Sequence, residues 1–433
     1  MRISDWSSDV CSSDLCPGCS KELVPDPDTF DTWFSSGQWP FITTTYHDSG
    51  KLAEFFPNSV METGHDILFP WVSRMIMLSL YKEQRVPFKH VYLHGLVLDP
   101  HGQKMSKSKG NVINPQEVMD AYGSDALRIG LLTSRSAGQN QAFGVDKVVA
   151  GRNFANKLWN IARYIESAVG ETGKDKTPKP STPADHWIMR ELDAAANEVA
   201  AMLEEYRFSE AVETVYHTIW DKLADWYLEA SKTALASSEK ASVMVWALET
   251  CLKIAHPFAP FVTEAIWQTL KWDDSLLITS SWPTRVTYDK KQADQFEQLQ
   301  KIIIESREVL AETGAQKVQT QTTSPLVAEN SEIISRMARI ESVHKVQEGS
   351  GLRLSSTNEP VWLDLSEEQI KTYKTALTKK HSEISKAKEL IEKRLANSAY
   401  IANAPEELVA ESKATLVQLA SQAKQLEKQL DLL

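Results

Sequence analysis

Apolar side chains recur at spacings of three and four along two consecutive stretches of the chain, residues 188–206 and 208–230. The stripe residues are Ile188, Leu192, Ala195, Val199, Met202 and Tyr206, then Phe208, Val212, Val215, Ile219, Leu223, Trp226 and Ala230. This period indicates one buried face of an amphipathic helix in each stretch. Two further helices are expected near residues 241–255 and 260–271. The pattern predicts an all-α bundle over residues 145–290, and a length of 433 residues leaves room for other domains.

A strand pattern precedes the bundle. Residues 91–98 (VYLHGLVL) have the apolar density of a buried parallel strand. After a loop, a helix is expected to begin with Asn114 as its cap, Pro115 at its first position and Glu117 at its third. Ligands bind at the carboxyl ends of parallel strands. Residues 16–144 are therefore expected to hold part of an α/β domain with a nucleotide site.

The intervening loop, KMSKSKGN at residues 104–111, places Lys104 and Lys107 three positions apart beside Ser106 and Ser108. Lysine carries a compact charge on a flexible stem, and positive charge beside a developing polyphosphate is a large catalytic contribution. The loop lacks the first glycine of GxxxxGK[ST], so it is not a Walker loop. A solvated basic turn has the same composition, and these residues alone leave that alternative open.

The C-terminal part changes pattern twice. Residues 291–365 predict a small α/β junction. Residues 366–433 carry two apolar seams that predict an antiparallel coiled-coil hairpin, formed by Ile370, Tyr373, Leu377, Ile384, Ala387 and Ile391, and by Leu416, Leu419, Ala423, Leu426, Leu430 and Leu433. Between Ile370 and Arg394 the first of these helices has eight basic residues against three glutamates. This excess indicates a face that contacts phosphate, although a solvated face fits the composition equally well.

The N-terminus departs from the rest of the chain. Residues 1–15 have no apolar period, resemble a translated sequencing adapter, and are expected to be a non-native leader. Cys16 and Cys19 have the spacing of half a zinc knuckle, but no second pair of ligands follows. A redox pair is the alternative, although no thioredoxin-like strand and helix surround it. Weak or absent zinc binding is expected.

The charge balance limits the kind of partner. The net charge of −11 argues against indiscriminate binding to nucleic acid, so any RNA contact must come from local basic faces. One such face lies at residues 152–160, where Arg152 and Lys157 are candidate RNA contacts and Phe154, Leu158 and Trp159 are expected in the core. Four cysteines and no secretory signal indicate a cytoplasmic location.

Five motifs in order resemble those of one enzyme family. They are DTWFSS (residues 31–36), TGHDILFPW (63–71), YLHGLVLD (92–99), the lysine loop and YGSDALR (122–128). The chain resembles the class I aminoacyl-tRNA synthetases, and among them those specific for valine. Isoleucyl and leucyl enzymes share the lysine loop, but isoleucyl enzymes differ around Asp66 and Trp71. The resemblance implies an α/β partial Rossmann catalytic domain, a helical anticodon-binding bundle, a junction and a coiled-coil tRNA-binding arm.

The resemblance also implies roles for individual residues. Gly64, Asp66, His94 and Gly95 would bind the adenylate, whereas from the residues alone Asp66 could equally be a helix cap. Trp33 and Trp71 would line the valine pocket, although core packing is the commoner role of tryptophan. Lys104 and Lys107 would act catalytically on ATP with Mg²⁺, assisted by Ser106 and Ser108. Further contacts to tRNA are expected from Lys379, Lys380, Lys386 and Arg394.

The implied reaction is ATP-dependent activation of valine and its transfer to tRNA-Val by a monomeric enzyme, with zinc in the full-length form. No HxGH motif occurs in the sequence, and neither does the family's editing domain. The chain is therefore expected to be a C-terminal fragment without activation activity of its own. An isoleucyl-type fragment and a non-catalytic tRNA-binding module are the alternatives.

Overall fold

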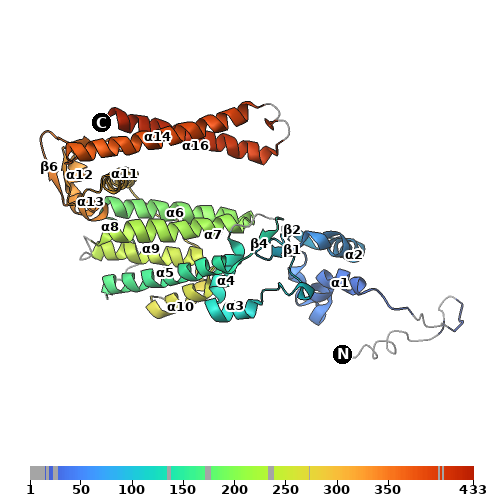
Figure 1. Cartoon of the computed structure of the whole chain (residues 1–433). Helices are drawn as coiled ribbons and strands as arrows, with labels where there is room; N and C mark the ends of the chain where they lie inside the picture. Colours follow the sequence, from blue (N-terminus) through green and yellow to red (C-terminus); the bar gives the residue numbers. More distant parts are fainter. Residues whose placement is uncertain are drawn as a thin grey trace. The chain divides into compact units, whose positions relative to one another are not determined.

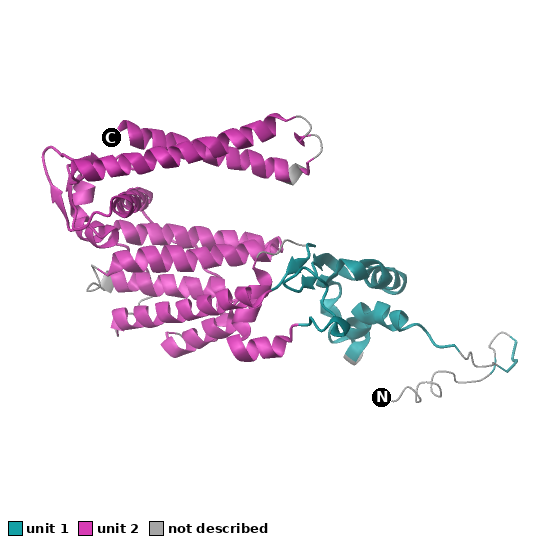
Figure 2. Ribbon diagram, in the orientation of Figure 1, with its two compact units in different colours: residues 1–112, 135–143 teal, residues 113–134, 144–433 magenta. Residues whose placement is uncertain are grey.

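A computed structural model describes residue 15 and residues 19–22, 28–133, 138–170, 177–232, 238–272, 274–397, 400–401 and 404–433. The chain divides into two compact units (Figure 2). Unit 1 comprises residues 1–112 and 135–143, and unit 2 comprises residues 113–134 and 144–433. Nearly all of the predicted leader lies outside the described residues. None of the described helices is long and apolar enough to cross a membrane.

Unit 1 contains two short pairs of parallel strands with helices beside them (Figure 1). β1 (Asn58–Gly64) pairs with β2 (Phe88–His94), and β3 (Val97–Leu98) pairs with β4 (Gln141–Ala142). Helices α1 (Thr32–Phe41) and α2 (Ser73–Glu83) pack closely. A Cβ added to Gly37 of α1 would lie only 2.7 Å from Leu78 Cδ1, so this glycine permits the close approach of the two helices.

The predicted strand over residues 91–98 is confirmed as parallel, but its continuity and burial were wrong. It divides at Gly95 and Leu96 into β2 and β3, and only Phe88 of β2 is buried. Val91 is 38% exposed. An apolar run shows that a strand is present, but it does not show what covers each face.

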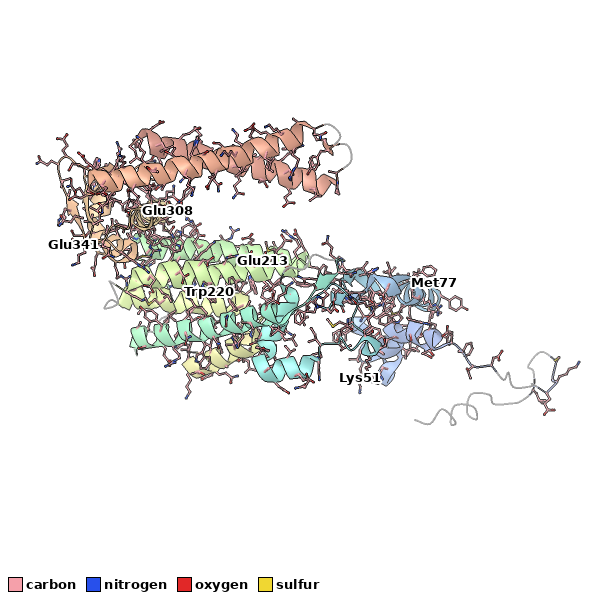
Figure 3. The ribbon with its side chains drawn as sticks, viewed as in Figure 1. Lys51, Met77, Glu213, Trp220, Glu308 and Glu341 are labelled. Atoms are coloured by element: carbon pink, nitrogen blue, oxygen red, sulfur yellow. The ribbon has the colours of Figure 1, made fainter. Side chains whose placement is uncertain are left out.

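The buried core of unit 1 is small. Its buried cluster consists of Met61, Val72, Met75 and Phe88, and Phe41 and Phe56 are also buried. Phe69 is 84% exposed, and Met77 of α2, labelled in Figure 3, is 61% exposed. The described part of unit 1 thus exposes several large apolar side chains.

Unit 2 is dominated by helices that lie side by side (Figure 1). In order these are α3 (Pro115–Tyr122), α4 (Ser124–Leu132), α5 (Val145–Val169), α6 (Pro183–Glu204), α7 (Phe208–His217), the π-helical segment η9 (Thr218–Leu228), α8 (Glu229–Ser231), α9 (Ser238–Ala255), α10 (Pro260–Leu270) and α11 (Lys290–Thr313). The predicted start of α3 is confirmed, because Asn114 Oδ1 accepts from Gln116 N at 3.0 Å and Pro115 follows it.

Both predicted apolar stripes form the core of the bundle. Leu192 and Val199 of α6 and Ile219 and Leu223 of η9 are fully buried in one continuous cluster. The expectation for α5 was only partly right. Phe154 and Leu158 are buried, whereas Trp159 is 37% exposed. The buried stripe of α5 runs through Phe154 and Leu158, and Trp159 lies at its edge.

A four-stranded sheet follows the bundle, as the predicted junction requires. Its order is β6–β5–β8–β7, formed by β5 (Gln319–Thr322), β6 (Ser342–Lys345), β7 (Leu352–Arg353) and β8 (Val361–Leu363), with α12 (Pro325–Glu329) and α13 (Ser331–Ala338) between the first two strands. The buried carboxylate of Glu305 on α11 accepts from the backbone N–H groups of Ser355 and Ser356, each at 2.9 Å. This contact fixes the strand connection to α11.

Two long helices complete unit 2. α14 (Glu367–Ala396) begins with a capping box between Ser366 and Gln369. α16 (Glu406–Asp431) packs against it as a helical hairpin (Figure 1). Tyr373 and Leu377 of the predicted seam are buried, and α14 also contacts α11.

Candidate functional site

The lysine loop is held at its base by Asp99 and Asn111. Asp99 Oδ1 accepts from the backbone N–H groups of His101 at 3.0 Å and Gln103 at 2.7 Å. Asn111 Nδ2 donates to Asp99 Oδ2 at 2.9 Å, and Asn111 Oδ1 accepts from Ser106 N at 3.0 Å. Both ends of the loop therefore meet at one carboxylate.

This base leaves the cations free to meet an anion. Lys104 and Lys107 are exposed, and neither ammonium group forms an ion pair with any described residue. Ser106 Oγ and Ser108 Oγ lie 3.1 Å apart between them. The left-handed backbone at Gly110, with φ of +67°, closes the short 3₁₀ turn η7 (Lys107–Lys109). The loop can present two positive charges and two hydroxyl groups to one ligand.

Hydrogen bonds lower the pKa of Asp99, that from Asn111 first and then that from Gln103 N–H. A lowered pKa means that the loop gains stability above the ordinary aspartate range and loses it as the pH falls through the lowered value. Sequence reasoning missed both Asp99 and Asn111. The sequence does carry a signal for Asp99, since Asp-x-x-Gly favours a tight turn.

Replacing Asp99 with alanine should release the loop, because three donors lose their acceptor. Backbone amides of residues 101–106 should then exchange hydrogen about tenfold faster after correction for intrinsic rates. Glu54→Ala, which removes an exposed carboxylate of the same unit, should leave them unchanged. Wild-type protein should show the same acceleration only in acid, below the ordinary aspartate pKa of about 3.9. Equal exchange in the two variants would contradict the assignment.

The carboxyl ends of β1 and β2 bring three predicted adenylate residues together. The register sets Gly64 opposite His94. A Cβ on Gly64 would lie 2.7 Å from Asp66 Oδ1 and 3.7 Å from His94 Cε1. Asp66 is exposed and does not cap the 3₁₀ helix η5 (His65–Ile67), so the alternative reading of it as a cap was wrong. His94 Nε2 lies 3.3 Å from Glu62 Oε1.

Gly95, also predicted at the adenylate, has a packing role. A Cβ there would lie 1.6 Å from the Gln139 carbonyl oxygen, so no larger residue fits. The segment before β4 runs alongside, with Leu96 N donating to Asn140 Oδ1 at 2.7 Å. This close approach accounts for the glycine without a ligand.

The two predicted pocket tryptophans come from elements that pack together, α1 and the segment η6 (Leu68–Val72). The Trp33 ring lies under Arg74, 5.6 Å from the guanidinium carbon. Trp71 is half-buried against the core, and its Nε1 is buried without a hydrogen-bond partner. An unpaired buried donor is uncommon in folded proteins.

Of the two predicted RNA contacts in the bundle, one already pairs with another residue of the chain. Lys157 pairs with Asp225 at 3.1 Å and lies 5.0 Å above the Trp220 ring. Arg152 is exposed and lies 5.7 Å from the Tyr122 ring. In the same unit Asp125 of α4, which sequence reasoning also missed, accepts from the N–H groups of Phe261 and Val262 at the start of α10.

The predicted contacts of the hairpin separate into two groups. Lys380 pairs with Glu312 at 2.5 Å. Lys379, Lys386 and Arg394 are exposed and form no ion pair with described residues. Spacings of seven and eight place these three cations on one face of α14.

The metal prediction is only partly covered, since Cys16 lies outside the described residues. Cys19 is an exposed free cysteine. In the described part of the chain, no group of three or more histidine, cysteine, aspartate or glutamate side chains could hold a metal ion.

Three family models match the chain in succession. Residues 3–143 match tRNA synthetases class I (I, L, M and V), residues 185–323 match the anticodon-binding domain of tRNA ligase, and residues 369–433 match the valyl tRNA synthetase tRNA binding arm. The last match selects valine among the class I enzymes. The chain belongs to the valyl-tRNA synthetase family.

Curated valine–tRNA ligases are similar along most of the chain. The protein of Carboxydothermus hydrogenoformans is 34% identical, with 100% of this chain and 53% of the relative aligned. That of Streptomyces avermitilis is 36% identical over 94% of this chain and 48% of the relative. The chain thus spans about half the length of these relatives.

A solved structure supports the synthetase fold. The LeuRS of Agrobacterium radiobacter, in a ternary complex with tRNA and LeuAMS, has a TM-score of 0.53 and 22% identity, over 62% of this chain and 35% of that protein. The expected fold class is therefore right at the level of a class I catalytic fold followed by a helical anticodon-binding domain.

Proposed function

We propose that this chain supplies part of the activation site and the tRNA-binding parts of a valine–tRNA ligase. In that reaction the valine carboxylate attacks the α-phosphorus of ATP, the bond from that phosphorus to the bridging oxygen breaks, and pyrophosphate leaves. The valyl group then passes from the adenylate to tRNA-Val. Such chemistry depends on positioning and on stabilising charge.

One observation carries the proposal. The Asp99–Asn111 base holds the backbone of the lysine loop and leaves both predicted catalytic ammonium groups exposed and unpaired among the described residues. Lys104 and Lys107 would neutralise the phosphates of ATP, and Ser106 and Ser108 would donate to them. Mg²⁺ would enter with the phosphates, which is its usual mode in nucleotide sites.

Other residues of unit 1 would bind the rest of the adenylate. Gly64, Asp66 and His94 share the carboxyl edge of β1 and β2, where Asp66 could accept from the ribose or from the valine ammonium group. Trp33 and Trp71 would flank the valine side chain, and the unpaired Nε1 of Trp71 supports a site there. Gly95 would contribute by allowing the backbone of Gln139 to lie close beside these residues.

The proposal extends to the organisation of the chain. Residues 16–144 would be half of a Rossmann catalytic domain, residues 145–290 the anticodon-binding domain, residues 291–365 the junction and residues 366–433 a coiled-coil tRNA-binding arm, with residues 1–15 as a foreign leader. A cytoplasmic location, a monomeric state and zinc in the full-length protein remain predictions.

Binding of ATP with Mg²⁺ to the chain tests the lysine loop. Lys104→Ala and Lys107→Ala should each weaken binding about tenfold, the usual effect of losing a charge-assisted hydrogen bond. Lys109→Ala is the matched control, since Lys109 is an exposed lysine of the same turn, and its effect should stay within about twofold. Equal losses of ATP affinity in all three variants would indicate unspecific attraction. Absence of ATP binding by the wild-type chain would contradict the proposal.

A further inference from the structure

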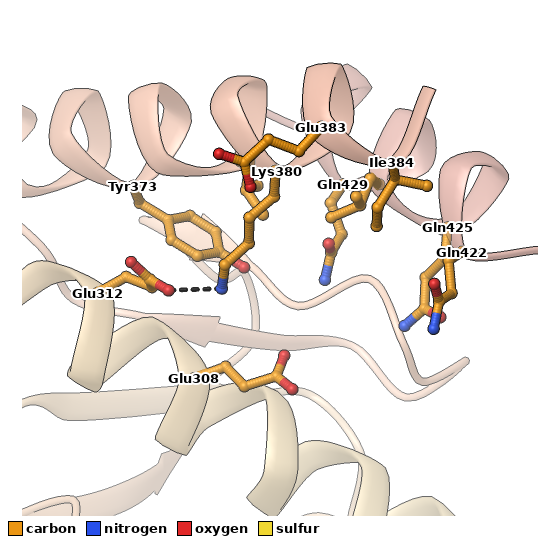
Figure 4. Close-up of a pocket in the computed structure, with 11 residues that line it drawn as sticks. Glu308, Glu312, Tyr373, Lys380, Glu383, Ile384, Gln422, Gln425 and Gln429 are labelled. Atoms are coloured by element: carbon orange, nitrogen blue, oxygen red, sulfur yellow. Dashed lines mark ion pairs between the residues drawn. The ribbon is translucent and has the colours of Figure 1, made fainter. Parts of the chain in front are cut away.

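A cavity of about 300 Å³ lies in unit 2 where the hairpin α14–α16 meets α11 (Figure 4). Three carboxylates line it, Glu308 and Glu312 from α11 and Glu383 from α14. Lys380 is the one cation among its lining residues and is paired with Glu312. Glu308 and Glu383 form no ion pair with a described residue. The cavity therefore has an excess of negative charge.

Two polar side chains of largely buried residues also face the cavity. Tyr373 is 3% exposed and Gln429 is 6% exposed, and both line the cavity. Neither side chain has a hydrogen-bond partner in the described part of the chain. Figure 4 shows both pointing from the hairpin toward the space above Glu308. Their polar atoms open onto the cavity, so a bound group there would supply the hydrogen-bond partners that these two side chains lack.

The arrangement favours a ligand with several separated cationic groups. In Figure 4 the carboxylates stand at different places around the cavity rather than converging on one point. Leu377, Ile384 and Leu426 form apolar wall between them. Burial and the neighbouring Glu305 and Glu312 raise the pKa of Glu308, whereas Lys380 lowers it. A second cation near Glu308 would relieve this repulsion.

We propose that this cavity binds a linear polyamine, with ammonium groups on the carboxylates and methylene groups against the apolar wall. The proposal does not depend on the ligase activity, because the cavity lies within unit 2, apart from the lysine loop in sequence and in unit.

Titration calorimetry with spermidine at about 0.15 M salt, which screens unspecific attraction, tests the proposal on the whole chain. One saturable site is expected, with affinity falling from spermidine to putrescine to ethylamine. Glu308→Gln combined with Glu383→Gln should weaken spermidine binding about tenfold or more. Glu411→Gln, an exposed glutamate of α16 outside the cavity, should change it less than twofold.

A variant that should bind spermidine more tightly distinguishes the loss of carboxylates from misfolding as the cause of weaker binding. Lys380→Met frees Glu312 and should strengthen spermidine binding several-fold, whereas Lys379→Met makes the same charge change on an exposed neighbour and should have little effect. Absence of a saturable site, equal effects in the paired variants, or equal competition by Mg²⁺ would overturn the proposal.

Discussion

Replacing Lys240 with methionine should lower the free energy of unfolding of unit 2 by about 3–5 kcal/mol, the usual result of breaking a buried ion pair. Lys240 is 2% exposed, and its Nζ lies 2.6 Å from Oδ1 of the fully buried Asp185. Tyr227 Oη donates to the same oxygen at 2.8 Å, and Thr182 N donates to Oδ2 at 2.9 Å. Loss of the ammonium group would leave a buried carboxylate without its counter-charge.

The pH dependence of this loss of stability tests whether the unpaired charge of Asp185 causes it. Burial alone would raise the pKa of Asp185, but the charge of Lys240 and the surrounding hydrogen bonds outweigh it and hold the pKa below its ordinary value. In the wild type this contribution is therefore complete at neutral pH and is lost only as the pH falls through the lowered pKa. In Lys240→Met burial dominates and the pKa rises, so the loss of stability should be smaller at pH 5 than at pH 7.5.

Urea unfolding followed by circular dichroism measures both effects. Lys301→Met, at an exposed position of α11, should change the free energy by less than about 0.5 kcal/mol. Adding Asp185→Asn to Lys240→Met should recover part of the loss, because the unpaired charge is gone. A loss in Lys240→Met no larger than in Lys301→Met, or one that does not change with pH, would show that the pair is not coupled.

Removing three positive charges from α14 should weaken tRNA binding on the order of 10²-fold at about 0.1 M salt, if each contacts a phosphate. The variant is Lys379→Gln with Lys386→Gln and Arg394→Gln. These side chains are exposed, share one face and are unpaired among the described residues. The slope of log K against log salt should become shallower by about two to three.

A control with the same change in net charge separates contact from general repulsion. Lys290→Gln, Lys413→Gln and Lys424→Gln remove three exposed cations that lie off this face. Filter binding over a salt series should show a small loss and an unchanged slope for that variant. Equal losses in the two triple variants would contradict a specific RNA face on α14.

The sequence predicted the elements of unit 2 well because their periodicity is local. The buried stripes of α6 and η9 needed only a helical period, and the cap of α3 needed only Asn114 and Pro115. Trp159 was misplaced because the period did not reveal which edge of the α5 stripe faces solvent. The pairing of Lys380 with Glu312 was also invisible, since the two residues are separated by most of the junction.

The candidate site was only half predictable, for a similar reason. A motif indicates the residues that are expected to meet a ligand, and it is the basis for proposing Lys104 and Lys107. The residues that support them, Asp99 and Asn111, act through backbone donors that only the folded loop brings together. The packing role of Gly95 beside Gln139 was likewise not predictable from its motif, because Gln139 is distant in the sequence.

The most direct test of the central proposal is the selectivity of this chain among tRNAs. Dissociation constants for tRNA-Val, tRNA-Ile and an unrelated tRNA should be measured at about 0.15 M salt. Preference for tRNA-Val of about tenfold or more, equal to ~1.4 kcal/mol, is the result that we expect. Equal affinity for all three, or preference for tRNA-Ile, would contradict the assignment to a valine–tRNA ligase.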